Sequence, residues 1–278
     1  MKWAILRGMS GRWIEIADGV LVRRYAELDQ TLGLVVGAER CLVVDTGRDE
    51  VHGAEMAAAV REVTPLSWTV LITHSHWDHF FGTASFVPCA AWAHERCRSI
   101  IADRAEDMRA RGLRYYASAG RSDLAVHLTA ATVVLPTDVL TSDVTLDLGN
   151  RSVTLVHPGR GHTSNDVVAH VPDAGVVFAG DLVEQGAPPV IGDDAYPLEW
   201  PITLDAVLGL APAVVVPGHG EPVDRAFVEG QQDDLAVVAE LVRAVAAGDV
   251  SVEDAVGRSP YPSDATMPAL SRTQPATP

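Results

Sequence analysis

The chain is poor in cysteine. Only three cysteines, Cys41, Cys89 and Cys97, occur among 278 residues. Their number is odd and they lack a C-x-x-C spacing, so the sequence predicts neither a disulfide framework nor a cysteine-ligated zinc site. Cys41 lies in an apolar, strand-like run and is expected to be a small buried hydrophobic residue. This usage is typical of a reducing compartment.

Long hydrophobic runs are also missing. The apolar stretch over residues 207–216 is broken by Pro212, well short of the roughly 20 residues that a membrane-spanning helix needs. The apolar start over residues 3–6 ends at Arg7, which is too short for the core of a secretory signal. We therefore expect a cytoplasmic protein that does not associate with membranes.

Positive charge is scarce. There are 21 Lys and Arg residues against 37 Asp and Glu residues, which gives a formal net charge of −16. Nucleic-acid binding depends on cationic side chains that displace counterions from phosphates. The balance therefore disfavours nucleic-acid partners and indicates a soluble chain that repels polyanions.

Apolar stretches that alternate or run continuously predict strands, and apolar residues at helical spacing predict the helices between them. The predicted strands lie within residues 13–48, 68–72, 138–157, 166–171, 176–179 and 213–216. The predicted helices cover residues 49–63, 94–117, 123–130, 202–210, 224–247 and 251–257. Strands followed by helices occur twice, which favours an α/β (α+β) fold of two mostly antiparallel or mixed sheets with helices outside.

No repeat or low-complexity linker divides the chain. We therefore predict a single domain over residues 1–258. The proline-rich residues 259–278 are expected to form a loose tail.

The strongest functional signal is His-x-His-x-Asp-His, formed by His74, His76, Asp78 and His79 directly after a predicted buried strand. Residues two apart in an extended segment point the same way, so His74 and His76 can reach one metal ion. A helical turn after His76 would direct Asp78 and His79 toward a second position. Four such side chains within six residues are costly to bury without a metal, which favours a metal site over a polar surface turn.

Three more strand-like stretches end in residues that can bind metal. His162 follows a glycine after the strand near residue 156; His157 competes for the same role, and we favour His162 because the glycine turn allows close approach. Asp181 follows another strand, and its two oxygens suit a bridge between two metals. His219 lies in a Pro-Gly-His-Gly segment after a fourth strand. Strand ends on one edge of a sandwich can converge on one cleft.

Taken together, these motifs resemble the metallo-β-lactamase superfamily over residues 15–222. The resemblance implies a four-layer αββα sandwich with two metal ions. It implies that the first metal is bound by His74, His76 and His162. It implies that the second is bound by Asp78, His79 and His219, with Asp181 bridging the two. Asp45 matches an aspartate that in this family usually supports the metal ligands.

The resemblance also implies a metal-dependent hydrolase. Zinc, two ions per chain, is the default for nitrogen and oxygen ligands, with iron or manganese as alternatives. A pair of cations lowers the pKa of a water between them, so that hydroxide is available near neutral pH. This hydroxide would cleave an ester, thioester, lactone or amide bond of a small molecule. We assign Asp78 and Asp181 catalytic as well as metal-binding roles.

The branch of the superfamily is less sharply defined. True β-lactamases of the family typically lack the bridging aspartate, so Asp181 favours thioesterases such as glyoxalase II, lactonases and related esterases. Glu184 stands where some lactonases carry a tyrosine. The spacing from His162 to Asp181 is that of persulfide dioxygenases, which use a single iron. A mononuclear iron dioxygenase and a β-lactamase-like enzyme are therefore the alternatives.

The surroundings of the predicted site are open to two interpretations. The arginine-rich residues 96–131 are either a lid or the surface of a homodimer. Five aromatic residues are either core or the lining of a substrate pocket: Trp77, Phe80, Phe81, Tyr196 and Trp200. The loop over residues 183–200 is expected to select the substrate, because specificity often varies through loops on a rigid scaffold.

Overall fold

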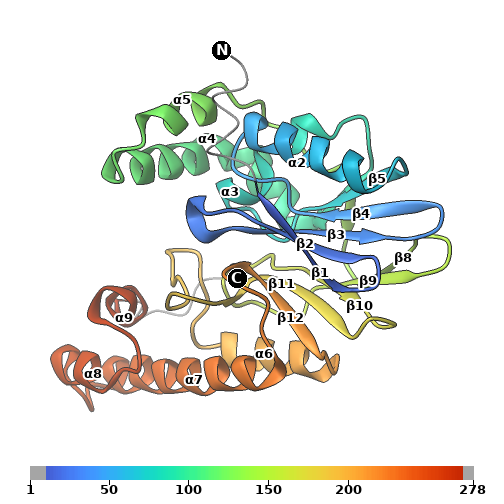
Figure 1. Cartoon of the computed structure of the whole chain (residues 1–278). Helices are drawn as coiled ribbons and strands as arrows, with labels where there is room; N and C mark the ends of the chain where they lie inside the picture. The colour runs from blue at the N-terminus through green and yellow to red at the C-terminus, as the bar shows by residue number, and fades with distance from the viewer. Residues whose placement is uncertain (1–10, 272–278) are drawn as a thin grey trace.

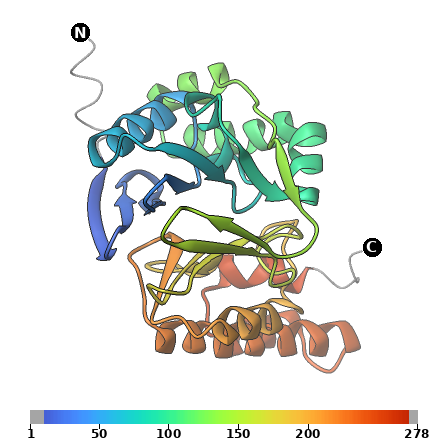
Figure 2. The ribbon, with the colours of Figure 1, turned by 90° about the vertical axis from the view of Figure 1, so that its right-hand side faces the viewer.

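The computed structural model describes residues 11–271, so the expectation about the apolar segment before Arg7 concerns residues outside this range. Two β-sheets lie face to face, and a helical layer covers the outer side of each (Figure 1). The four layers are also visible from the side (Figure 2). The predicted α/β class and αββα architecture are confirmed.

The first sheet has seven strands in chain order and joins an antiparallel half to a parallel half. Neighbours from β1 to β4 are antiparallel, whereas those from β4 to β7 are parallel. The strands are β1 (Arg12–Ala17), β2 (Val20–Arg24), β3 (Thr31–Val36), β4 (Arg40–Val44), β5 (Ser67–Leu71), β6 (Ala91–His94) and β7 (Asp138–Leu140).

The second sheet has five strands in the order β12-β11-β10-β9-β8. All neighbours are antiparallel except β11 and β12, which are parallel. The strands are β8 (Val144–Asp147), β9 (Ser152–Val156), β10 (Val168–Val171), β11 (Val176–Glu184) and β12 (Val214–His219). Strands β4, β5, β11 and β12 supply or directly precede most of the predicted site residues.

The predicted helices all occur within a few residues of their expected bounds. They are α2 (Glu50–Val63), α4 (Glu95–Ser118), α5 (Ser122–Ala130), α6 (Trp200–Gly209), α7 (Arg225–Ala247) and α8 (Val252–Arg258). Local capping explains several ends. The Asp49 side chain accepts from His52 N at the start of α2, and Gly248, with a φ of 79°, ends α7 in the left-handed region.

Three apolar clusters bind the four layers together. The first cluster lies between α2, α4 and the first sheet, with Met56 and Val43 among its buried members. The second lies between the two sheets and includes Leu42 and Phe178. The third joins the second sheet to α6 and α7. Each sheet is therefore apolar on both faces, which explains the continuous apolar strands in the sequence.

The C-terminal segment differs from its prediction as a loose tail. Residues 263–270 form helix α9 (Ser263–Leu270), which packs on α7 and α8 with Leu270 only 2% exposed. The proline content predicted a loose tail, but Pro262 is the N-cap of this helix and Pro268 lies within it. Residues 272–278 lie outside the described range, and the assignment of residues 1–258 to one domain stays a prediction. Among residues 11–271, no helix is both long and apolar enough to cross a bilayer.

Candidate metal centre

The His-x-His-x-Asp-His segment begins just beyond the carboxyl end of β5. The backbone of His76 is extended, and the short helix α3 (Trp77–Phe80) begins with the next residue. The predicted change from extended to helical backbone after His76 is therefore present. It brings Asp78 and His79 to a position beside the one that His74 and His76 face.

The other predicted residues come from three further segments of the second sheet. His162 lies in the loop between β9 and β10, and His219 is the last residue of β12. Asp181 does not follow β11, as expected, but lies within it, because the strand continues to Glu184. A register irregularity at Gly180, with a φ of 55°, interrupts the pairing with β12 beside Asp181.

All seven side chains meet in one cleft and form two groups. We call His74, His76 and His162 the three-histidine group, and Asp78, His79 and His219 the mixed group. Asp181 lies between them: its Oδ2 is 3.6 Å from His74 Nε2, 3.4 Å from His162 Nε2 and 3.5 Å from His219 Nε2. Its Oδ1 is 3.3 Å from His79 Nε2. The carboxylate thus contacts both groups.

Each histidine of the cleft has its outer nitrogen held, which fixes the nitrogen that faces inward. In the mixed group, His79 Nδ1 donates to Asp45 Oδ2 (2.8 Å) and His219 Nδ1 donates to Leu28 O (2.7 Å). These bonds leave Nε2 of each ring facing the carboxylates. Such outer partners orient metal ligands in known sites.

The three-histidine group follows the same rule. His162 Nδ1 donates to Val190 O (3.1 Å), His74 Nδ1 lies 3.0 Å from Thr73 Oγ1, and His76 Nε2 donates to Asp194 Oδ2 (3.0 Å). Thr73 Oγ1 donates to Asp45, so it accepts from His74. His76 therefore differs from the others in presenting Nδ1 to the cleft.

Burial and charge act differently on the two groups. Burial lowers the pKa of His74 well below its usual value and that of His162 to about 4. Burial also opposes the charged form of His79 and His219, but Asp181 and Asp78 outweigh it and raise both pKa values. For Asp78, burial is outweighed by His79 and His219, which hold its pKa at about 2. The two groups thus differ: burial disfavours the charged form of His74 and His162, whereas the carboxylates favour the charged form of His79 and His219.

The donor set fits divalent metal ions. His74 Nε2, His79 Nε2 and Asp181 Oδ1 are buried without a hydrogen-bond partner, which is uncommon for polar atoms. His162 Nε2 and His76 Nδ1 lie 2.8 Å apart, and two such lone pairs repel unless a cation or proton lies between them. Within each group the candidate ligand atoms lie within 4.8 Å of one another. Imidazole nitrogens with carboxylate oxygens are typical zinc ligands.

The sequence matches a known protein family. The sequence profile of the metallo-beta-lactamase superfamily matches residues 27–219, more than half of the chain. The chain belongs to the metallo-beta-lactamase superfamily. It is a metal-dependent hydrolase of that superfamily, and the predicted ligands all lie within the matched residues.

The curated relatives match this chain at low sequence identity. A metallo-beta-lactamase type 2 of Bacillus cereus is 28% identical over 202 residues, which are 70% of this chain and 69% of that protein. An acyl-coenzyme A thioesterase MBLAC2 of Gallus gallus is 26% identical over 55% of this chain and 57% of its own length. The relatives thus span two kinds of hydrolase.

Solved structures agree with the fold. A metallo-beta-lactamase from Pontibacter korlensis superposes with a TM-score of 0.63 and 19% identity, over 82% of this chain and 99% of that one. A metallo-beta-lactamase from Hirschia baltica gives a TM-score of 0.60 at 16% identity, over 81% and 97% of the two chains. At these identities the likeness concerns the fold.

The competing candidate His157 lies outside the two groups. Its Nδ1 donates to Asp166 O (2.7 Å), and its ring packs on His94 at 4.3 Å between centroids. Sequence reasoning did not find the outer partners Leu28, Val190 and Asp194, because they come from loops distant in sequence. Two of them use backbone carbonyls, which any residue type provides.

Core packing accounts for three of the five aromatic residues. Phe80, Phe81 and Trp200 are at most 1% exposed, so they belong to the core. Trp77 packs on Tyr116 of α4. The Arg160 guanidinium lies over the ring of Tyr196.

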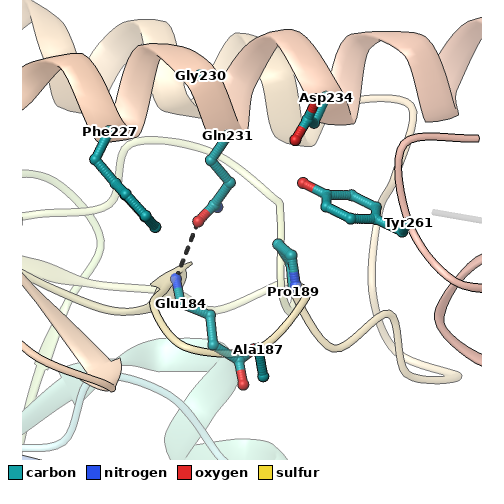
Figure 3. Close-up of a pocket in the computed structure, with 8 residues that line it drawn as sticks. All are labelled: Glu184, Ala187, Pro189, Phe227, Gly230, Gln231, Asp234 and Tyr261. Carbon is teal, nitrogen blue, oxygen red and sulfur yellow. Dashed lines mark hydrogen bonds between the residues drawn. The ribbon is translucent and has the colours of Figure 1, made fainter.

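Behind the 185–190 loop lies a cavity of about 350 Å³, between that loop and α7 (Figure 3). None of the five aromatic residues lines it. Its lining residues are Glu184, Ala187, Pro189, Phe227, Gly230, Gln231, Asp234 and Tyr261. Gln231 fixes the floor: its Oε1 accepts from Glu184 N and its Nε2 donates to Leu182 O. Burial and the nearby Asp181 raise the pKa of Glu184 to about 7.

Proposed function

We propose that this protein is a dinuclear zinc hydrolase that cleaves an ester, thioester, lactone or amide-type bond of a small molecule. The observation that carries the proposal is Asp181, whose two oxygens contact both candidate ligand groups. A carboxylate in this position can bind two ions at once, which a single imidazole nitrogen cannot do. Nitrogen and oxygen donors favour zinc, and iron or manganese would use the same residues.

The protein's own residues would prepare the reaction. His74, His76 and His162 would hold one ion, Asp78, His79 and His219 the other, and Asp181 both. When bound, such a pair supplies a water of lowered pKa and a Lewis acid for the scissile oxygen. Asp45 orients His79 and, through Thr73, His74, so it keeps one ring of each group in place. Asp78 and Asp181 supply anionic charge to the reacting centre, and their ionised state is favoured by the neighbouring histidines.

The ester and thioester classes are favoured over β-lactams by the presence of Asp181 and by the thioesterase among the relatives. A β-lactamase-like activity is the second candidate, because a relative that the chain covers over 69% of its length is named a metallo-beta-lactamase. A mononuclear iron dioxygenase acting on a thiol or persulfide is the third. A small-molecule substrate, a cytoplasmic location and a homodimer remain predictions.

One experiment separates these candidates. The purified protein would be analysed for metals and then assayed against a panel of lactones, thioesters and β-lactams, with and without a chelator. The proposal expects about two zinc ions per chain and hydrolysis of a lactone or thioester that the chelator abolishes. One iron per chain with oxygen uptake on adding a persulfide would overturn it, and rapid turnover of β-lactams alone would favour the second candidate.

A further inference from the structure

His76 is held by an unusual partner among the five histidines of the cleft. His74 and His79 depend on Thr73 and Asp45, which are buried just beyond the ends of β5 and β4, and His162 and His219 donate to backbone carbonyls. His76 alone among them depends on a side chain of the 185–199 loop, the carboxylate of Asp194. Its orientation is therefore tied to a segment outside the sheets.

The loop is shaped to place this carboxylate. Tyr196 N donates to Gly161 O (2.7 Å), which anchors the loop beside His162, and Ala195 N donates to Gly192 O in a tight turn (3.2 Å). A side chain at Gly192 would bring its Cβ within 2.9 Å of Asp194 Oδ1, so the residue type at this position keeps space for the carboxylate. Asp194 Oδ2 is thereby presented to His76.

The other oxygen of the same carboxylate faces helix α4. Arg111 Nη1 lies 3.4 Å from Asp194 Oδ1, and its Nη2 lies 3.5 Å from the neighbouring Asp193. The side chains of Arg111 and Asp194 are each 30% exposed, whereas that of Asp193 is 98% exposed. An unbroken series of contacts thus runs from α4 through Asp194 to His76.

A second arginine, at the junction of α4 and α5, makes a similar connection to the mixed group. Arg121, just beyond the end of α4, forms an ion pair with Glu27 of the loop between β2 and β3. The next residue, Leu28, provides the carbonyl that accepts from His219 Nδ1. Arg111 of α4 and Arg121 at the start of α5 therefore contact the segments that hold one histidine of each group.

We propose that Arg111 is a positioning residue that acts through Asp194 on His76, so that α4 supports the metal affinity of the three-histidine group. Arg121 supports the mixed group in the same way, through the segment that carries Leu28. Residues 96–131 then act as a brace across the cleft. This inference rests on the proposed metal centre, because it assigns a cause for the affinity of each group.

The test measures zinc binding itself. Apo-protein would be titrated with Zn²⁺ in competition with a chromophoric chelator, which yields a dissociation constant for each ion. Asp194→Asn keeps the size of the side chain but offers His76 a neutral acceptor, and it should weaken one of the two ions by about 10- to 100-fold, the usual cost of losing an outer partner. The matched control, Asp193→Asn, removes the same charge one residue away and should leave both constants within about twofold.

Arg111→Gln should weaken the same ion by about two- to fivefold, because a partly exposed ion pair contributes little. This loss should vanish when the substitution is made in the Asp194→Asn background, since the arginine acts only through that carboxylate. Arg121→Gln should affect the other ion. Spectra of ¹⁵N-histidine-labelled protein should show the His76 Nε2–H signal move in Asp194→Asn and in Arg111→Gln but not in Asp193→Asn.

The outcomes separate two failures. If the parent protein binds no zinc, the proposed function is wrong. If the parent binds two ions and Asp194→Asn leaves both constants and the His76 signal unchanged, the positioning role is refuted. An Arg111→Gln effect that persists undiminished in the Asp194→Asn background would also overturn it.

Discussion

The two ligand groups lie side by side, but burial and charge shift the pKa values of their histidines in opposite directions. In the three-histidine group, burial lowers the pKa values of His74 and His162. In the mixed group, carboxylates raise the pKa values of His79 and His219. Burial thus favours the neutral ring at two of the three histidines in one group, whereas carboxylates favour the charged rings of the other group. The mixed group must release protons before a cation can bind.

The groups also differ in how they are supported. His79 depends on Asp45, a residue with a φ of 61° that follows β4 and also accepts from Thr73 N, just beyond β5. His76 depends on Asp194 of a surface loop. Each group therefore has one histidine supported by Asp45, directly for His79 and through Thr73 for His74, and its remaining histidines are held by loop segments. Only His76 is held by the side chain of a loop residue.

The largest effect is expected from removing Asp181, the residue that contacts both groups. Asp181→Ala should lose at least one metal ion and lower kcat/KM by more than about 100-fold, because losing a ligand exceeds the roughly 10- to 100-fold cost of losing an outer partner. The fold should survive, since the change shortens a side chain in a cleft. Metal analysis, kinetics and circular dichroism would measure this.

A suitable control is Asp173→Ala, which removes a carboxylate from an ion pair with Arg151 that includes none of the cleft residues. Its metal content and rate should match those of the parent. Full metal content and full rate in Asp181→Ala would show that the site is assigned wrongly.

Removing one histidine should separate the groups. His162→Ala should bind about one metal ion fewer per chain, because its Nε2 faces His76 and Asp181. His157→Ala should keep its metal, since that ring contacts Asp166 O and His94 instead. Elemental analysis of both variants decides the matter, and the reverse result would exchange the roles of the two histidines.

A milder change tests the support of the mixed group. Asp45→Asn should weaken zinc at that group by about 10- to 100-fold, because one amide cannot accept from His79, Thr73 N and Thr73 Oγ1 together. Asparagine tolerates the left-handed backbone of this position, so the fold should be retained. Competition titration should show the larger change at the ion that His219→Ala also loses; an equal loss at both ions, or no loss at either, would contradict this support.

The smallest effect concerns pH. Raised pKa values at His79 and His219 mean that protons compete with metal already above pH 6.5, and the competition grows as the pH falls. The mixed group contains two histidines with raised pKa values, whereas the three-histidine group contains only one, His76. The mixed group should therefore lose zinc first on acidification.

Equilibrium dialysis between pH 8 and pH 5 would show this order. The variants His162→Ala and His219→Ala, each retaining one intact group, assign the two steps. Release from the three-histidine group at the higher pH would contradict the electrostatic difference.

Much of the molecule follows from local sequence. Continuous apolar runs predicted the buried strands, and helical spacing predicted α2, α4 and α7. The run His74 to His79 was decisive, because six consecutive residues fix their own relative placement, with an extended His76 followed by a helical turn. Proline content, in contrast, concealed helix α9, whose stability comes from packing on α7 and α8.

Tertiary structure alone decided how the distant segments support one another. Asp181 was expected after its strand, but a register irregularity at Gly180 places it within β11 and between the two groups. The pairing of His76 with Asp194, and of Asp194 with Arg111, joins residues from three segments. Sequence determines residue types and local backbone geometry, whereas only packing of the layers sets which distant side chains come within hydrogen-bond distance.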